Sequence, residues 1–457
     1  MGTDQSIEEQ QHEQPPAQRF TGWHIGTIAL LAVGYSAYYF CRSDYSVSLP
    51  LILAEQVKHG ADAHLTEIRL GSIASLGVLS YALGKVPAGA FADRFGGRYN
   101  FLGGMAGSIF FTLMFIAGGG LPLFTLAWIG NRLAQSMGWA GLVKVASRWF
   151  SYSTYGGVMA VLSLSYLFGD AISREAMSLL LDHGMGWRGL FATGAGLLAL
   201  LLVVNLVFLR ESPSAYNLDD AVENPENLLA HAEANHSQPS AAAVFRGLFS
   251  SYAFWLVCFL SLGTTLLRET FNLWTPTYFT QFAGMTSAQA ASGSALFPLF
   301  GGFSVLLAGF LSDFFGASGR SRILFGGLAF SVVVLVALAF APAHSPQWIP
   351  LTLVGLVGFM LIGPYSYLAG AMSLDFGGKD GGGTASGVID SAGYLAGTFS
   401  GNGMAYVLVT FGWKSFFLVL AVVAALSSVV AVALLRQQNK MHKLKVQEPL
   451  QVVQSQR

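Results

Sequence analysis

The stretch from residue 414 to residue 436 reads KSFFLVLAVVAALSSVVAVALLR, and no charged residue lies between Lys414 and Arg436. A helix of about 20 apolar residues spans the hydrocarbon core of a bilayer. Further runs without Asp, Glu, Lys or Arg cover residues 189–209 and 323–374. Only helices or closed barrels satisfy the backbone in lipid, and these runs lack the alternation of barrel strands. The sequence therefore predicts a protein built from transmembrane helices.

The composition agrees with this class and excludes several others. Of the 457 residues, 11% are Asp, Glu, Lys or Arg, whereas soluble domains contain about 25%. The chain has 24 basic and 24 acidic residues, so it lacks the positive charge of a nucleic-acid binder. Two cysteines exclude a disulfide scaffold. No metal-ligand cluster, nucleophile motif or phosphate-binding loop is recognisable, so we expect neither an enzyme nor a bound metal or cofactor.

Twelve apolar spans can be placed, which predicts an all-α membrane protein with twelve transmembrane helices. They cover residues 22–48, 69–91, 99–117, 122–145, 155–181, 188–209, 252–281, 288–312, 323–341, 348–373, 384–410 and 414–435. Cytoplasmic loops are enriched in Lys and Arg. If both termini are cytoplasmic, 15 such residues face the cytoplasm and four face outside. We therefore expect this orientation, in a bacterial inner membrane.

The two halves of the chain repeat one another. The eight-residue interval from Arg42 to a proline recurs from Arg268, at an offset of 226 residues. Gly-Trp-Arg at 186–188 recurs as Gly-Trp-Lys at 412–414 with the same offset. Repeats of this kind indicate an internal duplication. The predicted parts are a cytoplasmic N-terminal tail, a six-helix bundle, a polar central loop, a second six-helix bundle and a cytoplasmic C-terminal tail, at 1–21, 22–209, 210–250, 251–436 and 437–457.

Residues 84–98 read GKVPAGAFADRFGGR and join the second and third spans. Two pseudo-symmetric six-helix halves form the architecture of the major facilitator superfamily, and this stretch resembles its signature between helices 2 and 3. The resemblance implies that Asp93, Arg94 and Arg98 form a charge cluster that latches the halves. Asp313 belongs to the weaker copy of the motif in the second half. Topology alone can explain the arginines, but it does not explain the paired acids.

Five cations lie within the predicted spans, namely Arg42, Lys85, Arg132, Arg174 and Arg268. Each costs roughly 2.5–3.5 kcal/mol at a helix centre, so each is expected to face a partner or a watery cavity. Asp170 and Arg174 are four residues apart, which allows an ion pair on one helix. Arg132 resembles a basic residue that supports helix 1 in the superfamily. The residues considered for a coupling role are Asp44, Arg132, Asp170, Arg174, Glu269 and Asp390.

Arg42 and Arg268 occupy equivalent positions in the first span of each half, so a pseudo-twofold axis brings them to one central site. Guanidinium groups about 7–10 Å apart repel by roughly 2 kcal/mol at an effective dielectric constant near 20. A dianion removes that repulsion and accepts paired hydrogen bonds from both groups. Phosphate or a phosphate monoester fits best, and a dicarboxylate fits second. Asp44 and Glu269 are expected to point to other helix faces, although either acid or backbone carbonyls remain an alternative partner.

Other donors accompany this arginine pair. Tyr35, Tyr39 and Arg42 follow one helical stripe, and Tyr81 precedes Lys85 by one turn. Hydroxyl groups add donors without adding charge. Tyrosine also serves as a packing residue, so each position allows both interpretations. The candidate set of assisting residues is therefore Tyr35, Tyr39, Tyr81, Lys85 and Tyr394.

Residues 34–42 read GYSAYYFCR and resemble the helix 1 signature of the organophosphate:inorganic phosphate antiporters. Residues 383–387 (GTASG) and 274–278 (WTPTY) continue the likeness. The resemblance implies that Arg42 and Arg268 bind phosphate, assisted by the lysine and tyrosines named above. It also implies exchange of a phosphorylated solute for inorganic phosphate. We expect these two small anions and the lipid bilayer as partners, a monomeric chain and no nucleic acid.

The chain departs from that family at two positions. Tyr166 and Pro298 stand where some members carry a histidine and an acid. The organic part of the substrate therefore stays open. One alternative is a proton-coupled symporter of a carboxylate or other organic anion, with Asp44, Glu269 or Asp390 as proton carriers. Another is a transporter-like membrane sensor of sugar phosphates.

Overall fold

The computed structural model describes residues 20–221, 241–314, 319–343 and 345–455. The described chain is almost entirely helical. The long helices are α1 (Gly22–Lys58), α2 (Ala63–Phe95), α3 (Gly97–Ala117), α4 (Leu121–Trp149), α5 (Tyr152–Asp182), α6 (Trp187–Phe208), α8 (Tyr252–Gln281), α9 (Ser287–Phe314), α10 (Gly319–Phe340), α11 (Trp348–Ala369), α12 (Ala371–Gly397) and α13 (Asn402–Ser455). They correspond in number and order to the twelve predicted spans.

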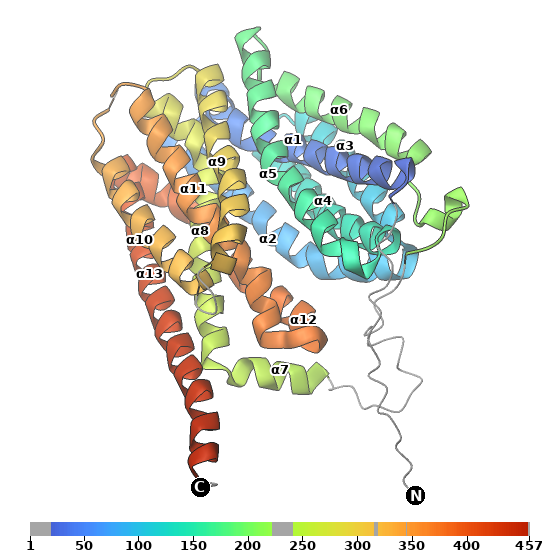
Figure 1. Cartoon of the computed structure of the whole chain (residues 1–457). Helices are drawn as coiled ribbons and strands as arrows, with labels where there is room; N and C mark the ends of the chain where they lie inside the picture. Colours follow the sequence, from blue (N-terminus) through green and yellow to red (C-terminus); the bar gives the residue numbers. More distant parts are fainter. Residues whose placement is uncertain (1–19, 222–240, 315–318, 344, 456–457) are drawn as a thin grey trace, which may run out of the picture.

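The helices form two bundles that lie side by side (Figure 1). In the first bundle α4 packs against α2 and α3, while α1 packs against α5 and α6. In the second, α9 packs against α11, and α8 against α12 and α13. Contacts between the bundles run from α5 to α9, from α1 to α8, and from α2 to α12 and α13. The first helix of each half therefore lies at the boundary between the bundles, where the repeat predicts it.

Ten stretches of described helix are long and apolar enough to cross a membrane. One of them, at 384–440, contains the last two predicted spans. Helix α4 is not among the ten, and its buried residues include Asn131, Arg132 and Gln135. These polar side chains lower the mean hydropathy, yet they face protein rather than lipid. A hydropathy threshold therefore misses a helix whose polar face is turned inward.

The last spans differ from the prediction. A single helix over 384–410 is wrong, because α12 already begins at Ala371 and ends at Gly397. A short 3₁₀ turn follows at Thr398–Ser400. Helix α13 is then broken at Gly412, where φ is 74° and ψ is 177°. Glycine adopts a positive φ without the steric cost of a side chain, so the break occurs there.

Two segments predicted as loop or tail contain helix. In the central loop, Pro213–Tyr216 forms a 3₁₀ turn and α7 covers Ala241–Ser250. Helix α7 runs across the lower end of the second bundle (Figure 1). After residue 436, α13 continues as far as Ser455. Helix α7 has only ten residues, and the stretch after residue 436 is polar, so neither was predicted to span a membrane. Neither property excludes a helix.

Adjacent helices run in opposite directions, so the molecule has two ends. We call the end that holds Gly22 and Phe208 the terminal end, and the end that holds Lys58 and Asp182 the distal end. The bundles meet at the distal end. There the Ser178 hydroxyl donates to the Ala288 carbonyl over 2.8 Å.

A second seam at the distal end joins α2 to the start of α13. The Ser75 hydroxyl donates to the carbonyl of Thr398, and the Asn402 amide donates to Ser75 Oγ over 2.8 Å. At the terminal end, the ion pairs among described residues stay within one bundle. Lys144 contacts Asp93 at 2.8 Å, for example. The described structure is therefore sealed at its distal end.

Candidate functional site

A cavity opens between the two bundles at mid-depth. Its volume is about 570 Å³, including the part open to solvent. Its charged and polar lining comprises Tyr39, Arg42, Ser43, Tyr45, Ser46, Arg132, Asp170, Arg174, Arg268, Glu269, Asn272 and Ser400. Both members of the symmetric arginine pair thus border one space, one from α1 and one from α8.

Two arginines of the first bundle share one aromatic ring. The Arg42 guanidinium lies 4.7 Å from the centre of the Tyr81 ring, and that of Arg132 lies 4.9 Å from the same centre. Arg132 also lies 3.4 Å from the side-chain oxygen of Gln135. Within the described part of the chain, neither arginine forms an ion pair with an acid. Their positive charges are therefore available to an anion in the cavity.

Arg268 is only partly satisfied by the protein. Its Nη2 donates to Glu269 Oε1 over 2.6 Å and lies 3.3 Å from the Tyr394 hydroxyl. The guanidinium also lies 4.8 Å from the centre of the Tyr365 ring. Its Nε is buried and has no hydrogen-bond partner in the described structure. A buried donor without a partner costs about 1–3 kcal/mol, so an acceptor at this position would be favoured.

The expectation that Glu269 points away from Arg268 is wrong. Adjacent residues start from different helix faces, but both side chains are long enough to bend toward each other. Asp44, by contrast, does not pair with Arg42. Its Oδ1 accepts from the Tyr45 amide over 2.6 Å, and its Oδ2 is buried without a partner. Arg268 thus has an ion-pair partner within its own bundle, whereas Arg42 has none among the described residues.

Lys85 and Asp390 connect the two bundles beside the cavity. The Lys85 ammonium forms an ion pair with the Asp390 carboxylate, from α2 to α12. It also lies 4.5 Å from the centre of the Tyr394 ring, and that ring is 5.5 Å from the Tyr81 ring. Lys85, which is predicted to assist anion binding, is therefore held by an acid of the opposite half. From the sequence, that acid was expected to have only a coupling role.

The tyrosines take different places. Tyr39 lines the cavity, and its ring centre is 5.2 Å from the Arg42 guanidinium. Tyr35 lies behind it and packs against the rings of Tyr39 and Trp139 at 5.7 Å and 5.5 Å. Tyr365, whose ring lies beside Arg268, was not predicted to belong to the site. Its position as a polar side chain within an uncharged run was the signal that could have indicated it.

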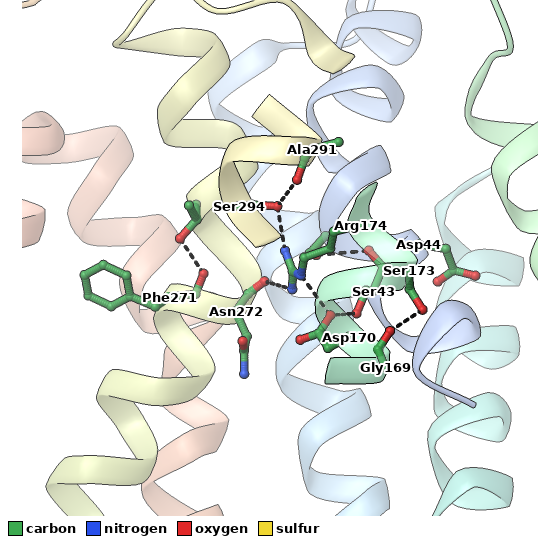
Figure 2. A network of polar contacts seen from close by, with 12 residues as sticks. Ser43, Asp44, Gly169, Asp170, Ser173, Arg174, Phe271, Asn272, Ala291 and Ser294 are labelled. Carbon is green, nitrogen blue, oxygen red and sulfur yellow. Dashed lines mark hydrogen bonds and ion pairs between the residues drawn. The ribbon is translucent and has the colours of Figure 1, made fainter. Parts of the chain in front are cut away.

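The predicted pair of Asp170 and Arg174 is present. Arg174 Nε donates to Asp170 Oδ1 over 2.8 Å, and both residues are buried. Figure 2 shows this pair between helices of both bundles. The four-residue spacing therefore predicted this ion pair correctly. Arg174 also donates hydrogen bonds to residues of two other helices.

The charge cluster of residues 93–98 holds the first bundle together. Asp93 contacts Lys144 at 2.8 Å. Arg98 donates to the carbonyls of Leu206 and Leu209 over 2.8 Å and 2.6 Å. These carbonyls at the end of α6 lack donors within the helix, and Arg98 supplies them. The guanidinium of Arg94 lies 5.6 Å from the Phe95 ring centre.

The weaker copy of this cluster is described in part. The side chain of Asp313 lies outside the described residues. Arg320 of the same copy contacts Asp375 at 2.7 Å, within the second bundle. Latching of the halves by either copy therefore stays a prediction.

Known proteins match this chain along most of its length. The family model described as Major Facilitator Superfamily matches residues 31–401. A probable hexose phosphate transport protein of Chlamydia pneumoniae is 26% identical and is matched over 93% of its length and 92% of this chain. The membrane sensor protein UhpC of Escherichia coli is also 26% identical, over 94% of its length and 92% of this chain. The glycerol-3-phosphate transporter of Bacillus subtilis is 24% identical, over 87% of its length and 85% of this chain.

Solved structures agree on the fold. A bacterial homologue of the human lysosomal transporter Spinster superposes with a TM-score of 0.71 at 13% identity, covering 92% of this chain and 99% of that one. A D-xylose–proton symporter gives a TM-score of 0.70 at 14% identity, covering 89% and 97%. The twelve-helix transporter fold is thereby confirmed. The relatives' names also confirm the resemblance to the organophosphate:inorganic phosphate antiporters.

Proposed function

The chain belongs to the Major Facilitator Superfamily, and on that premise we propose that it transports an organic phosphate or related organic anion in exchange for inorganic phosphate. It is a multi-pass integral membrane protein of transporter type, not an enzyme. We further propose that it acts as a monomer in a bacterial inner membrane with both termini in the cytoplasm. We also propose that the sealed distal end then faces outside and that the described structure is an inward-facing form.

The observation that carries this proposal is the arrangement of Arg42 and Arg268 around one cavity. Among the described residues, Arg42 forms no ion pair with an acid, and Nε of Arg268 has no hydrogen-bond acceptor. A phosphate group carries two negative charges and several acceptor oxygens, so it suits both arginines at once. Tyr39 lines the same cavity, and Lys85, Tyr81 and Tyr394 lie beside its arginines as further donors and ring faces. Relatives named as hexose phosphate and glycerol-3-phosphate transporters support the same substrate class.

Exchange in reconstituted vesicles tests the proposal directly. Vesicles loaded with phosphate should take up labelled phosphate from outside, and Arg42→Lys or Arg268→Lys should reduce the rate at least tenfold, because lysine lacks the planar pair of donors. Arg69→Lys is the matched control, since that arginine is exposed and lies outside the cavity lining. An absence of exchange in the unsubstituted protein, with uptake of every tested anion unaffected by both cavity variants, contradicts the proposal.

One observation favours proton-coupled uptake of a carboxylate or other organic anion as a second candidate. Asp44 is fully buried, and its Oδ2 has no partner in the described structure. A carboxylate in that setting is costly while charged, so it is a candidate proton carrier. Uptake that is abolished by collapsing the proton gradient and preserved without internal phosphate would favour this candidate over exchange.

A sensor is the third candidate, because two relatives that are matched over most of their length are named membrane sensor proteins. A sensor binds its ligand without moving it across the bilayer. Saturable binding of glucose 6-phosphate or inorganic phosphate, combined with no flux of either in vesicles, would identify this function. Flux above that of protein-free vesicles would exclude it.

A further inference from the structure

Arg174 is one of the largest fully buried side chains of the molecule, with 2% of its surface exposed. Asp170 neutralises it through Nε. A guanidinium has five N–H donors, however, and a single carboxylate contact leaves most of them unused. The ion pair alone therefore does not account for the position of this side chain.

The remaining donors cross to the other bundle. Nη1 donates to the Ser294 hydroxyl on α9 over 3.0 Å, and Nη2 donates to the backbone carbonyl of Asn272 on α8 over 3.0 Å. On the other side, the Ser43 hydroxyl of α1 donates to Asp170. Figure 2 shows these contacts converging on Arg174. We call this set, which consists of Ser43, Asp170, Arg174, Ser294 and the Asn272 carbonyl, the distal latch.

The chemistry of α8 explains why the Asn272 carbonyl is available. In an α-helix this oxygen would accept from the amide of the residue four positions later. That residue is Pro276, which has no N–H. A freed carbonyl inside a bilayer needs another donor, and Arg174 provides it. Pro276 of the second half thus frees the carbonyl, and Arg174 of the first half supplies its hydrogen bond.

The latch also borders the proposed binding cavity. Asp170, Arg174 and Asn272 line the same space as Arg42 and Arg268. Together with the contact between Ser178 and the Ala288 carbonyl, it joins α5 to the second bundle at the distal half of the membrane. Separation of the bundles on that side must break both bonds from Arg174.

We propose that Arg174, held in place by Asp170, is a positioning residue that keeps the distal end closed by bonding the carbonyl that Pro276 leaves free. This inference rests on the proposed function, because a closed distal end matters only if the bundles alternate between two open sides. The latch raises the share of the inward-facing form when the cavity is empty. Its loss favours the form that opens at the distal end.

Spin labels measure this closure without any transport assay. Asp182 and Gln289 are exposed at the distal ends of α5 and α9, so labels on Asp182→Cys and Gln289→Cys report the separation of the bundles there. Both native cysteines are buried. In the purified labelled protein, with no other substitution and no phosphate, we expect pulsed electron spin resonance to show mainly a short-distance population.

The variants remove the crossing bonds in two ways. The double variant Asp170→Asn/Arg174→Gln removes the charges together, so it leaves no unpaired ion in the protein. Pro276→Ala restores the amide that competes for the Asn272 carbonyl and leaves the ion pair untouched. Each should raise the long-distance population on the order of tenfold, which corresponds to the loss of one charge-assisted hydrogen bond. Glu175→Gln is the matched control, because Glu175 is the exposed neighbour of Arg174.

The outcomes separate this inference from the proposed function. Unchanged distance distributions in the double variant and in Pro276→Ala would overturn the latch, even if phosphate exchange were lost. An equal shift in Glu175→Gln would also overturn it, because the effect would then not depend on the crossing bonds. A shift confined to the latch variants supports the latch, and it does so even if the unsubstituted protein exchanges no phosphate.

Discussion

Tyr81 is the residue around which the cations of the first bundle gather. Its ring centre lies 4.7 Å from Arg42, 4.9 Å from Arg132 and 5.5 Å from the Lys85 ammonium. The negative face of an aromatic ring attracts cations, by about 2 kcal/mol or more where water is excluded. The ring therefore offsets part of the repulsion among these groups while adding no acid that would compete with an anion.

Substitution of Tyr81 separates the ring from its hydroxyl. Tyr81→Phe keeps the ring and should weaken phosphate binding by less than about threefold, whereas Tyr81→Leu should weaken it by on the order of tenfold. Isothermal titration with inorganic phosphate measures both. Tyr99→Leu serves as a control, since Tyr99 is exposed and stacks only with Arg98 in the described structure. Equal losses in the two Tyr81 variants would assign the role to the hydroxyl instead.

Residue partners could be predicted where a repeat or a helical spacing fixed them. The repeat placed Arg42 and Arg268 on one cavity, and the four-residue spacing paired Asp170 with Arg174. The bend of Glu269 onto its neighbour was missed, because it depends on rotamers rather than on position along the helix. Partners from the opposite half, such as Asp390 for Lys85, were beyond reach because no spacing links α2 to α12.

At the scale of helices, α2 and α12 are joined by the ion pair of Lys85 and Asp390. Both side chains are more than a quarter exposed, at 29% and 27%, so the pair contributes at most about 1 kcal/mol. If Lys85 binds phosphate, Asp390 competes with that anion for the ammonium group. Asp390→Asn should therefore tighten phosphate binding by about two- to fivefold, measured by titration. Weaker binding in Asp390→Asn would show that the acid orients Lys85 for the ligand rather than competing with it.

Helix α2 and the turn that precedes α13 approach closely through glycines in the distal half of the molecule. A Cβ added at Gly401 would lie 2.1 Å from the Gly71 carbonyl oxygen, which the backbone cannot accommodate without moving. Gly401→Ala should therefore push the bundles apart there and raise the distal-open population. A Cβ at Gly403 would meet only the Phe399 side chain, at 3.5 Å or more, so Gly403→Ala is the control. The labels at 182 and 289 report the result, and equal distances in both variants would contradict it.

Helix positions were predictable from apolar runs because lipid imposes a length and a composition. The residues at which the helices end were less predictable. The turn at Thr398–Ser400 lies inside an uncharged run and leaves no trace in hydropathy. Helix α7 follows a polar segment, and its ten residues are too few to span a membrane, so apolar runs of membrane length do not indicate it. The glycine break at residue 412 carried a signal, since the same Gly-Trp pair precedes α6.

For the whole molecule, the distribution of positive charge between the two bundles determines how a bound anion shifts their conformational equilibrium. Arg42, Arg132 and Lys85 come from the first bundle, and Arg268 comes from the second. A ligand shifts a conformational equilibrium only by its difference in affinity for the two states. A dianion that bonds Arg42 and Arg268 at once is held better when the bundles enclose it. Phosphate should therefore draw the bundles together at the terminal end.

Labels at Gly156→Cys and Gly387→Cys measure that closure, because a side chain at either position would meet nothing within 4 Å. Saturating phosphate should shorten the distance between them, while chloride at equal ionic strength should not, because a monovalent spherical ion cannot bridge both guanidinium groups. Arg268→Lys should reduce the shortening, since lysine lacks the planar fork that lets one ligand bind both halves. A distance unchanged at phosphate concentrations that saturate binding would mean that the anion binds to one bundle alone, and the two arginines would then not act as a pair.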